Sequence, residues 1–321
     1  MKLAFVFPGQ GSQYVGMGRE AFESYQEAAE VFMLADEILK FPLSRLCFEG
    51  PEEALNDTIN TQPAVFVVSL ALWEALKSRI EVDRALFVAG HSLGEYTALV
   101  ASCAMSFEEG LSLVRTRACL MKESGEKHRG GMAAVIGINL QKLEGICQEI
   151  SFRTGLCLKV ANHNSPEQYV ISGHREALEE AFLALRAVGA KVIPLKVSGA
   201  FHTELMASVQ EGLKKALSEV NIKPAVWPVV ANTKAFPIQN PEEIVEELAL
   251  QLTRPVLWKE SVEFMAQSGV EVFVEIGPGK VLTGLIKRTA PGARVFNIGN
   301  SSELESFIKE LKEMNYGKEG A

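Results

Sequence analysis

The feature that most constrains the fold is the pentapeptide GHSLG at residues 90–94. The apolar run before it, Ala85–Ala89, predicts a strand, and a helical pattern follows it. A Gly-x-Ser-x-Gly sequence between a strand and a helix is typical of a nucleophile elbow, a sharp turn from which the serine hydroxyl projects into a cleft. The helix N-terminus favours developing negative charge, and the amide of Leu93 can donate to an oxyanion. We therefore predict an α/β fold with Ser92 as a nucleophile.

The first half of the chain alternates short β-rich runs with longer helical patterns, which indicates a parallel sheet covered by helices. Leu3–Phe7 is the first predicted strand, and Pro63–Lys77 is predicted to be a largely buried helix. The last third of the chain is predicted to hold three strands, at Val226–Ala231, Val270–Glu275 and Arg294–Ile298, and a charged helix at Glu303–Met314.

The middle of the chain has a different pattern, which begins after a polar, Gly-rich segment at Glu123–Gly131 that we interpret as a linker. The elements predicted after it are strand, helix, strand, strand, helix and strand, and this βαββαβ order is typical of a ferredoxin-like unit. We therefore predict a large α/β-hydrolase-like domain with a parallel sheet, made of residues 1–125 and 198–315. An inserted small ferredoxin-like domain is predicted at residues 126–197, and a flexible tail at 316–321.

Composition narrows the class of protein. Hydrophobic residues make up 47% of the 321 residues and charged residues 22%, as in ordinary soluble globular proteins. The longest apolar stretch, around Ala64–Trp73, is about half the length of a membrane-spanning helix. Because Pro8 and Gly9 interrupt the first apolar run early, it does not resemble a secretory signal. We predict no membrane-spanning segment and a cytoplasmic location.

Charge and cysteine spacing exclude other classes. The net charge of −8 argues against broad binding to nucleic acid, although Lys287-Arg288 or Lys214-Lys215 could form a local basic patch. The five scattered cysteines have no Cys-x-x-Cys spacing, so that neither a disulfide framework nor a metal site is expected.

A serine hydroxyl needs an adjacent base, which is usually a histidine. His202 lies in a loop where the chain re-enters the large domain, and His163 lies in a turn-like stretch of the small domain. His91 is next to Ser92 on the turn, so that a packing role is expected for it. Position favours His202 and leaves His163 as the alternative.

The loop at residues 8–13 follows a strand and precedes a helix. In this position its backbone amides could donate hydrogen bonds to an anion. A rival interpretation is a dinucleotide fingerprint at Gly16-x-Gly18-x-x-Ala21, with Asp36 and Glu37 downstream. The fingerprint requires its first glycine directly after the strand, and this strand ends well before Gly16. We therefore disfavour a nicotinamide cofactor.

Arg115 and Arg117 lie in a helical pattern after the elbow. The planar guanidinium of arginine can clamp a carboxylate through two hydrogen bonds, although most helix arginines simply reach solvent. The pattern alone therefore assigns no role to either residue.

With these motifs in hand, the sequence resembles the malonyl-CoA:acyl carrier protein transacylases of fatty acid synthesis over nearly its whole length. The resemblance rests on FPGQGSQ at residues 7–13, GHSLGE at 90–95, NxNSP at 162–166, GAFH at 199–202, QLxxPVxW at 251–258 and ExGPG at 275–279.

This resemblance implies a role for five of the residues. Ser92 would be the acylated nucleophile and His202 its general base. The main-chain carbonyl of Gln251 would orient the histidine, so that no acidic triad member is required. The backbone amides of Gln10 and Leu93 would donate to the oxyanion.

The resemblance also implies the substrates. Arg117 would pair with the free carboxylate of the malonyl group, and the bulky Phe201 resembles the malonyl-selective form of its motif. Malonyl-CoA and holo acyl carrier protein would be the partners of a ping-pong transfer. We expect a monomer that uses neither a cofactor nor a metal. A serine hydrolase such as a thioesterase and a non-catalytic binding protein are the alternatives.

Overall fold

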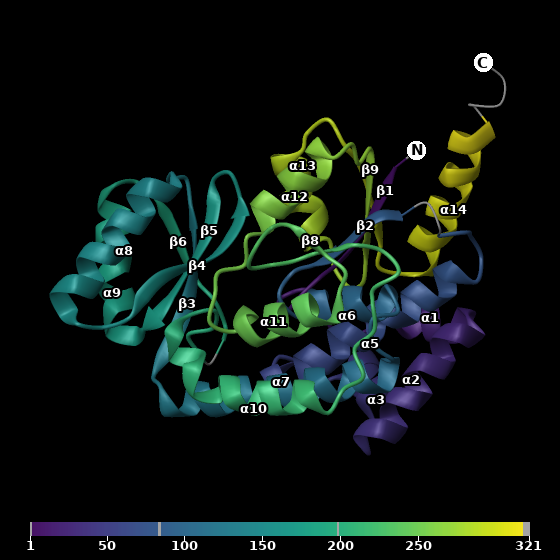
Figure 1. Cartoon of the computed structure of the whole chain (residues 1–321), viewed down its shortest axis with the longest axis horizontal. Helices are drawn as coiled ribbons and strands as arrows, with labels where there is room; N and C mark the ends of the chain where they lie inside the picture. Colours follow the sequence, from purple (N-terminus) through teal and green to yellow (C-terminus); the bar gives the residue numbers. More distant parts are fainter. Residues whose placement is uncertain (1, 83–84, 198, 317–321) are drawn as a thin grey trace.

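The computed structural model describes residues 2–82, 85–197 and 199–316. Of the predicted flexible tail at 316–321, residues 317–321 therefore lie outside the described residues. Figure 1 shows the larger part of the chain around one central sheet and the smaller part, in teal, at one end of the molecule.

The central sheet has six strands in the order β10-β9-β1-β2-β7-β8. All neighbours pair in parallel except β8, which is antiparallel to β7, so that the sheet is mixed and mainly parallel. These strands are β1 (Leu3–Phe7), β2 (Ala85–Gly90), β7 (Val229–Val230), β8 (Pro237–Ile238), β9 (Val272–Ile276) and β10 (Arg294–Ile298).

The strand predicted at Val226–Ala231 is much shorter in the structure, where β7 has two residues. The reason is local hydrogen bonding before β7. The amide of Val226 donates to the carbonyl of Ser102 and not to a neighbouring strand. Pro228 has no N–H that could donate to a neighbouring strand of the sheet.

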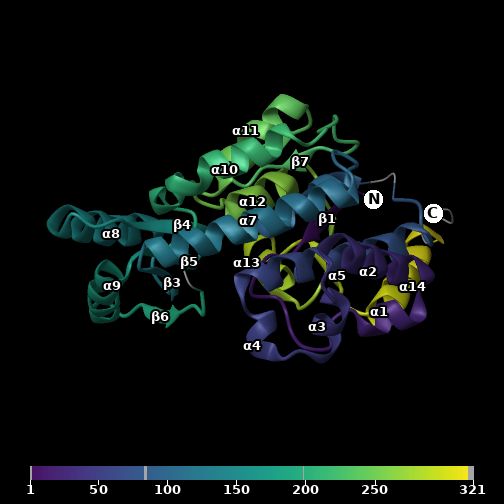
Figure 2. The ribbon, with the colours of Figure 1, turned by 90° about the horizontal axis from the view of Figure 1, so that it is seen from below.

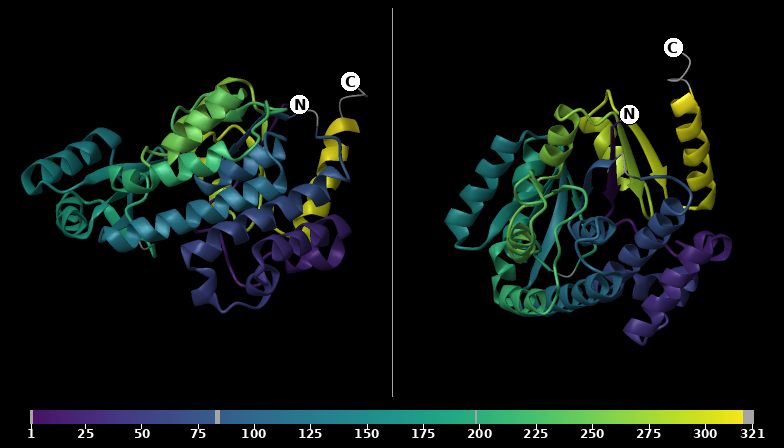
Figure 3. Two further views of the ribbon diagram at one scale, coloured as in Figure 1. Left: turned by 60° about the horizontal axis from the view of Figure 1, so that its bottom comes forward. Right: turned by 45° about the vertical axis from the view of Figure 1, so that its right-hand side comes forward.

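Side chains of β1 alternate between two helical layers, as expected for a sheet covered on both faces. Phe5 and Phe7 contribute to the core formed with the N-terminal helices, whereas Ala4 and Val6 contribute to the core formed with α12 and α13. The helices of this part are α1 (Arg19–Ser24), α2 (Gln26–Leu39), α3 (Leu43–Glu49), α4 (Glu52–Leu55), α5 (Thr58–Lys77), α6 (Leu93–Ala101), α7 (Phe107–Lys127), the short 3₁₀ helix η1 (Glu204–Met206), α10 (Ala207–Ser218), α11 (Pro241–Gln251), α12 (Trp258–Gln267), α13 (Val281–Thr289) and α14 (Ser301–Tyr316). In Figure 3, α14 (yellow) lies near the first helices (purple), far from the teal part.

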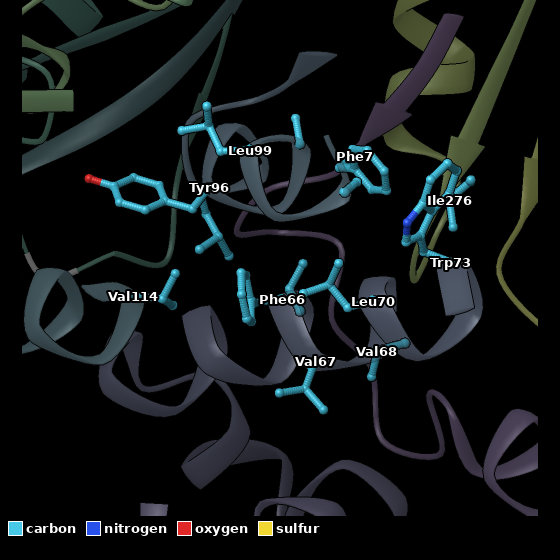
Figure 4. Packing of buried hydrophobic residues seen from close by; sticks show 14 of the residues in the cluster. Phe7, Phe66, Val67, Val68, Leu70, Trp73, Tyr96, Leu99, Val114 and Ile276 are labelled. Carbon is cyan, nitrogen blue, oxygen red and sulfur yellow. The ribbon is translucent and has the colours of Figure 1, made fainter. Parts of the chain in front are cut away.

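Helix α5 is the central helix of the core. Figure 4 shows Phe66 and Leu70 on one side of it and Val67 and Val68 on the other, and all four are buried. This helix of 20 residues is long and apolar enough to cross a membrane by length and composition, contrary to our expectation from the shorter apolar stretch. However, 83% of its apolar segment is buried inside the protein. Helix α5 is therefore the core helix of this fold.

Helix α5 begins at Thr58, earlier than predicted, and so contains Pro63 in its interior. The side chain of Asp57 accepts a hydrogen bond from the amide of Ile59 and caps the first turn. Proline cannot donate to the carbonyl four residues before it. Here Arg115 Nη1 donates to that carbonyl, of Ile59, at 2.7 Å. The helix tolerates the proline because Arg115 replaces the missing donor.

The smaller part has its own antiparallel sheet in the order β4-β5-β3-β6, which confirms the predicted ferredoxin-like βαββαβ unit. Buried apolar residues such as Leu143 and Ile171 form a core separate from that of the large part. The elements are β3 (Gly130–Ile136), α8 (Leu140–Thr154), β4 (Leu158–Ser165), β5 (Gln168–His174), α9 (Arg175–Ala187) and β6 (Lys191–Pro194).

The linker predicted at Glu123–Gly131 is wrong, because α7 continues through Lys127 and β3 begins at Gly130. The helix continues because Lys127 pairs with Glu123 one turn earlier and Ser124 donates to a carbonyl of η1. Figure 2 shows α7 reaching from the large part to the small sheet. The separate sheet and core support the proposed inserted domain at 126–197, whose first boundary lies within α7.

The small sheet is also joined to the large part along β4. The amide of Val256 donates to the Ala161 carbonyl, and the amide of His163 donates to the Val256 carbonyl, both at 2.9 Å. The side chain of His163 pairs with Glu260 of α12 at 2.9 Å. These bonds fix the end of β4, which lines the site described next.

Candidate active site

Ser92 lies on the turn between β2 and α6, where the sequence predicts it. Its φ of 51° and ψ of −102° place a non-glycine residue in a strained backbone conformation. A Cβ atom at Gly90 would lie 1.9 Å from the carbonyl carbon of Gly94, and one at Gly94 would lie 2.1 Å from the carbonyl oxygen of Phe7. The turn packs so closely against the strands that only glycine fits on either side of the serine.

His202 is the histidine that the fold brings to Ser92. Its Nε2 lies 2.8 Å from Ser92 Oγ, and its Nδ1 lies 2.8 Å from the main-chain oxygen of Gln251. A carbonyl only accepts, so that Nδ1 must carry the proton and Nε2 is free to accept from the serine hydroxyl. The ring thus has the tautomer that a general base for Ser92 requires.

The other two histidines near the elbow have different partners. His163, the alternative base, pairs with Glu260. His91 Nε2 lies 2.9 Å from Asn164 Oδ1, and its ring contacts Trp258. The geometry therefore favours His202 and gives His91 the packing role that we expect.

The environment of His202 keeps its imidazole neutral. Its side chain is buried, and burial together with the nearby charge of Arg117 lowers the pKa of His202 to about 3. A neutral imidazole at physiological pH is ready to take a proton, and the imidazolium it forms would be strongly acidic.

Arg117 projects from α7 into the same site and is 1% exposed. Its Nη2 donates to Ser92 Oγ at 2.8 Å and to Gln251 Oε1 at 2.9 Å, and its Nη1 donates to Gln62 Oε1 at 2.6 Å. Burial lowers the pKa of Arg117 from its ordinary value. Arg115 instead donates to the Ile59 carbonyl of α5, so that the structure distinguishes two arginines that the sequence pattern does not.

Gln251 connects the base to the arginine. Its carbonyl accepts from His202, its Oε1 accepts from Arg117, and its Nε2 donates to the carbonyl of Ser92 at 2.9 Å and to Glu95 Oε2 at 2.5 Å. Burial and repulsion by Glu247 raise the pKa of Glu95 well above its usual value. One glutamine at the end of α11 therefore contacts four groups of the site.

A cavity of about 220 Å³ opens onto these groups. Gln10 and Leu93, the predicted oxyanion donors, both line it. The Leu93 amide is the first of α6, and amides of the first turn have no partner within a helix. In the part of the chain that the structure describes, no group of three or more His, Cys, Asp or Glu side chains could hold a metal ion.

Sequence reasoning missed three residues of the site. Gln62 binds Arg117 from α5, but it directly precedes the helix predicted at Pro63–Lys77, so that no sequence signal placed it inside that helix. Asn232 accepts from the Ser92 amide, and its signal is an asparagine just after a predicted strand. Glu95 belongs to the quoted elbow motif, but its sequence position gives no partner.

Comparisons with known proteins agree with this geometry. Residues 4–313 match the acyl transferase domain family. The malonyl CoA-acyl carrier protein transacylase of Bacillus subtilis strain 168 is 42% identical over 316 residues, which are 98% of this chain and 98% of that protein. The chain belongs to the malonyl CoA-acyl carrier protein transacylase family.

Solved structures of this transacylase family have the same fold. The malonyl CoA-acyl carrier protein transacylase from Clostridium perfringens matches with a TM-score of 0.93 and 38% identity, covering 100% of both chains. A malonyl-transacylase in complex with its type II PKS acyl-carrier protein matches with a TM-score of 0.93 and 36% identity, covering 97% of this chain and 100% of that chain.

Proposed function

We propose that the protein transfers a malonyl group from malonyl-CoA to the thiol of holo acyl carrier protein through a malonyl ester on Ser92, and so supplies fatty acid synthesis. The observation that carries this proposal is the position of the buried Arg117 guanidinium, 2.8 Å from the hydroxyl of a serine that also contacts a neutral histidine. The names of the relatives in the family agree with it.

The first half-reaction follows from the hydrogen bonds. Ser92 Oγ gives its proton to His202 Nε2 and attacks the thioester carbonyl, while the amides of Gln10 and Leu93 stabilise the oxyanion. When the tetrahedral intermediate collapses, the carbon–sulfur bond breaks and His202 returns the proton to the sulfur of CoA. The product is the malonyl ester of Ser92.

The second half-reaction repeats these steps with another thiol. The phosphopantetheine thiol of the carrier gives its proton to His202 and attacks the ester carbonyl. The bond to Ser92 Oγ then breaks, and His202 returns the proton to the serine. The roles of nucleophile and base are thus reused without any cofactor.

Arg117 supports malonate as the acyl group. One methylene separates the reacting carbonyl of a malonyl group from its free carboxylate. A guanidinium in contact with Ser92 Oγ can reach that carboxylate while the carbonyl lies at the serine. A longer diacid would place its carboxylate farther from the serine than this buried arginine.

Mass spectrometry of the intact protein tests the first half-reaction. Brief mixing with malonyl-CoA should add one malonyl group to the wild-type chain and none to Ser92→Ala. Adduct on the alanine variant would refute Ser92 as the nucleophile, and absence of adduct on the wild type would favour a binding protein. Discharge of the adduct by holo carrier protein, but only slowly by water, would distinguish a transferase from a thioesterase.

We further propose that the carrier protein approaches over α13. Leu282 and Leu285 of this helix line the cavity, and Lys287 and Arg288 are exposed in its last turn. Arg288 also donates to Gln168 of the small sheet at 3.1 Å. A carrier with acidic side chains would complement this pair of cations beside the cavity.

The other basic pair, Lys214-Lys215, provides a control for this docking site. It lies on α10, and Lys214 already pairs with Glu211. Lys287→Glu should raise the KM for holo carrier protein severalfold while malonyl adduct formation from malonyl-CoA is unchanged, and Lys215→Glu should change neither. Equal effects of the two variants would refute docking over α13.

The cytoplasmic location, the monomeric state and the lack of binding to nucleic acid stay predictions from the sequence. Light scattering on the peak eluted from a size-exclusion column measures the molar mass and so tests the monomeric state directly.

A further inference from the structure

Asn232 is a buried residue beside the elbow. Neither the sequence analysis nor the proposed reaction assigns it a role. It follows β7 by two positions and is 1% exposed. Strand β7 pairs with β2, the strand that leads into the elbow. The topology therefore places this side chain against the carboxyl end of β2.

The side chain of Asn232 binds the backbone on both sides of His91. Its Oδ1 accepts from the amide of Ser92 at 2.7 Å, and its Nδ2 donates to the carbonyl of Gly90 at 2.7 Å. An asparagine amide has both a donor and an acceptor, so that one side chain satisfies an N–H and a C=O of the same tight turn. The two bonds fix the peptide groups that set the direction of the serine side chain.

The backbone of Asn232 is held as well. Its amide donates to Glu95 Oε1 at 2.9 Å, and its carbonyl accepts from the amide of Leu257 at 2.8 Å. Glu95 in turn accepts from Gln251, whose carbonyl holds His202. The anchor of the nucleophile and the anchor of the base thus meet at one carboxyl group.

The elbow needs such an anchor because Ser92 has a positive φ. A non-glycine residue in this region is strained and persists only where its surroundings enforce the conformation. The Ser92 amide donates to Asn232, which is not among the residues that line the cavity. The amides of Leu93 and Gln10 are then the ones available to an oxyanion.

We propose that Asn232 is a positioning residue for the acylation of Ser92, which it performs by holding the strained elbow through its side-chain amide. This inference rests on the proposed function for the identity of the acyl group, but not for the reactivity of the serine. The expected consequence of its loss is a misdirected nucleophile, and a shift of the reacting atom by 1 Å costs about a hundredfold in rate.

Two variants and a matched control test the proposal. Asn232→Ala removes both side-chain bonds, while Asn232→Asp keeps an acceptor for the Ser92 amide but loses the donor to Gly90. Asn297→Ala is the control, because Asn297 lies on β10 of the same sheet and its Nδ2 donates to a glycine carbonyl, that of Gly279, at 2.8 Å. Among the described residues, Asn297 forms no hydrogen bond with the elbow.

The measurement is the single-turnover rate of malonyl-enzyme formation, together with the rate at which a fluorophosphonate labels Ser92. We expect Asn232→Ala to slow both rates by about 10- to 100-fold with the KM for malonyl-CoA within about twofold of wild type. Asn232→Asp should lie between Asn232→Ala and the wild type, and Asn297→Ala should match the wild type.

Normal rates in folded Asn232→Ala, or equal losses in Asn297→Ala, would overturn the proposal. Urea unfolding of each variant establishes that it is folded at the assay temperature, and if Asn232→Ala does not fold, Asn232→Asp carries the test alone. If the wild type accepted the fluorophosphonate but formed no malonyl adduct, the proposed function would fail while the labelling comparison still tested Asn232.

Discussion

The free energy of unfolding should depend on pH through His202, and the size of the effect can be calculated from the pKa of this residue. Unfolded histidine has a pKa of about 6.5, whereas burial and Arg117 lower the pKa of folded His202 to about 3. Between these values the unfolded chain binds a proton that the folded chain rejects. The free energy of unfolding therefore falls as the pH is lowered through this window, and the loss stops below about pH 3.

The size of this loss follows from the two pKa values. One pKa unit corresponds to 1.36 kcal/mol, so that His202 should cost about 1.4 kcal/mol at about pH 5.5 and about 2.7 kcal/mol at about pH 4.5, relative to about pH 8. Burial also raises the pKa values of Glu95 and Glu247, and these shifts act on the unfolding free energy with the opposite sign. Comparing the wild type with a variant that lacks only the imidazole cancels the contribution of these other groups.

The assay is urea unfolding of the wild type and of His202→Gln across this pH range. The difference between their unfolding free energies should change by about 2.7 kcal/mol between about pH 8 and about pH 4.5, with the variant losing less stability on acidification. Ser92→Ala keeps the imidazole and should retain the wild-type dependence. A difference that does not change with pH would refute a depressed pKa and the neutral base derived from it.

Three substitutions give further predictions. Arg117→Ala should lower malonyl transfer at least 30-fold, since truncating one partner of a buried charge pair costs about 2 kcal/mol or more; acetyl transfer from acetyl-CoA, assayed in parallel, should be spared or raised, and equal losses would contradict the carboxylate clamp. Arg115→Ala should lower the free energy of unfolding in urea by about 1–3 kcal/mol, because it leaves the Ile59 carbonyl of α5 without its partner, while kcat is unchanged. A loss of kcat at full stability would contradict this structural role of Arg115 in α5. Gly94→Ala should abolish fluorophosphonate labelling and lower the melting temperature, because its Cβ would lie 2.1 Å from the Phe7 carbonyl oxygen; normal labelling would show that the elbow can relax.

The elbow and the sheet could be predicted because their signals are local. Ala85–Ala89 is apolar, β-rich and followed by glycines at fixed spacing, and each of these cues depends on neighbours in the sequence. The βαββαβ order of the small unit is likewise a succession of local patterns. The register of β2 beside β7, which brings Asn232 to Ser92, depends on residues 140 positions apart and has no local signal.

The errors in the predicted elements have the same origin. The polar end of α7 resembles a linker because one of its two stabilising contacts, Ser124 with a carbonyl of η1, comes from 81 positions away. Pro63 resembles a helix start because the donor that replaces its missing N–H belongs to Arg115 on another helix. In both cases tertiary hydrogen bonds override the local preference.

The surroundings of Arg117 explain how a buried cation can favour a substrate carboxylate. Its hydrogen bonds go to the uncharged oxygens of Gln62, Gln251 and Ser92, and its guanidinium lies over the ring of Tyr96. None of the ion pairs among the described residues includes Arg117. Glu95 is separated from it by the amide of Gln251. A carboxylate in direct contact would neutralise the guanidinium and compete with the malonyl group, whereas neutral amides hold its position and leave its charge for the substrate. Gln62→Glu should therefore raise the KM for malonyl-CoA, and an unchanged KM in a folded variant would contradict this account.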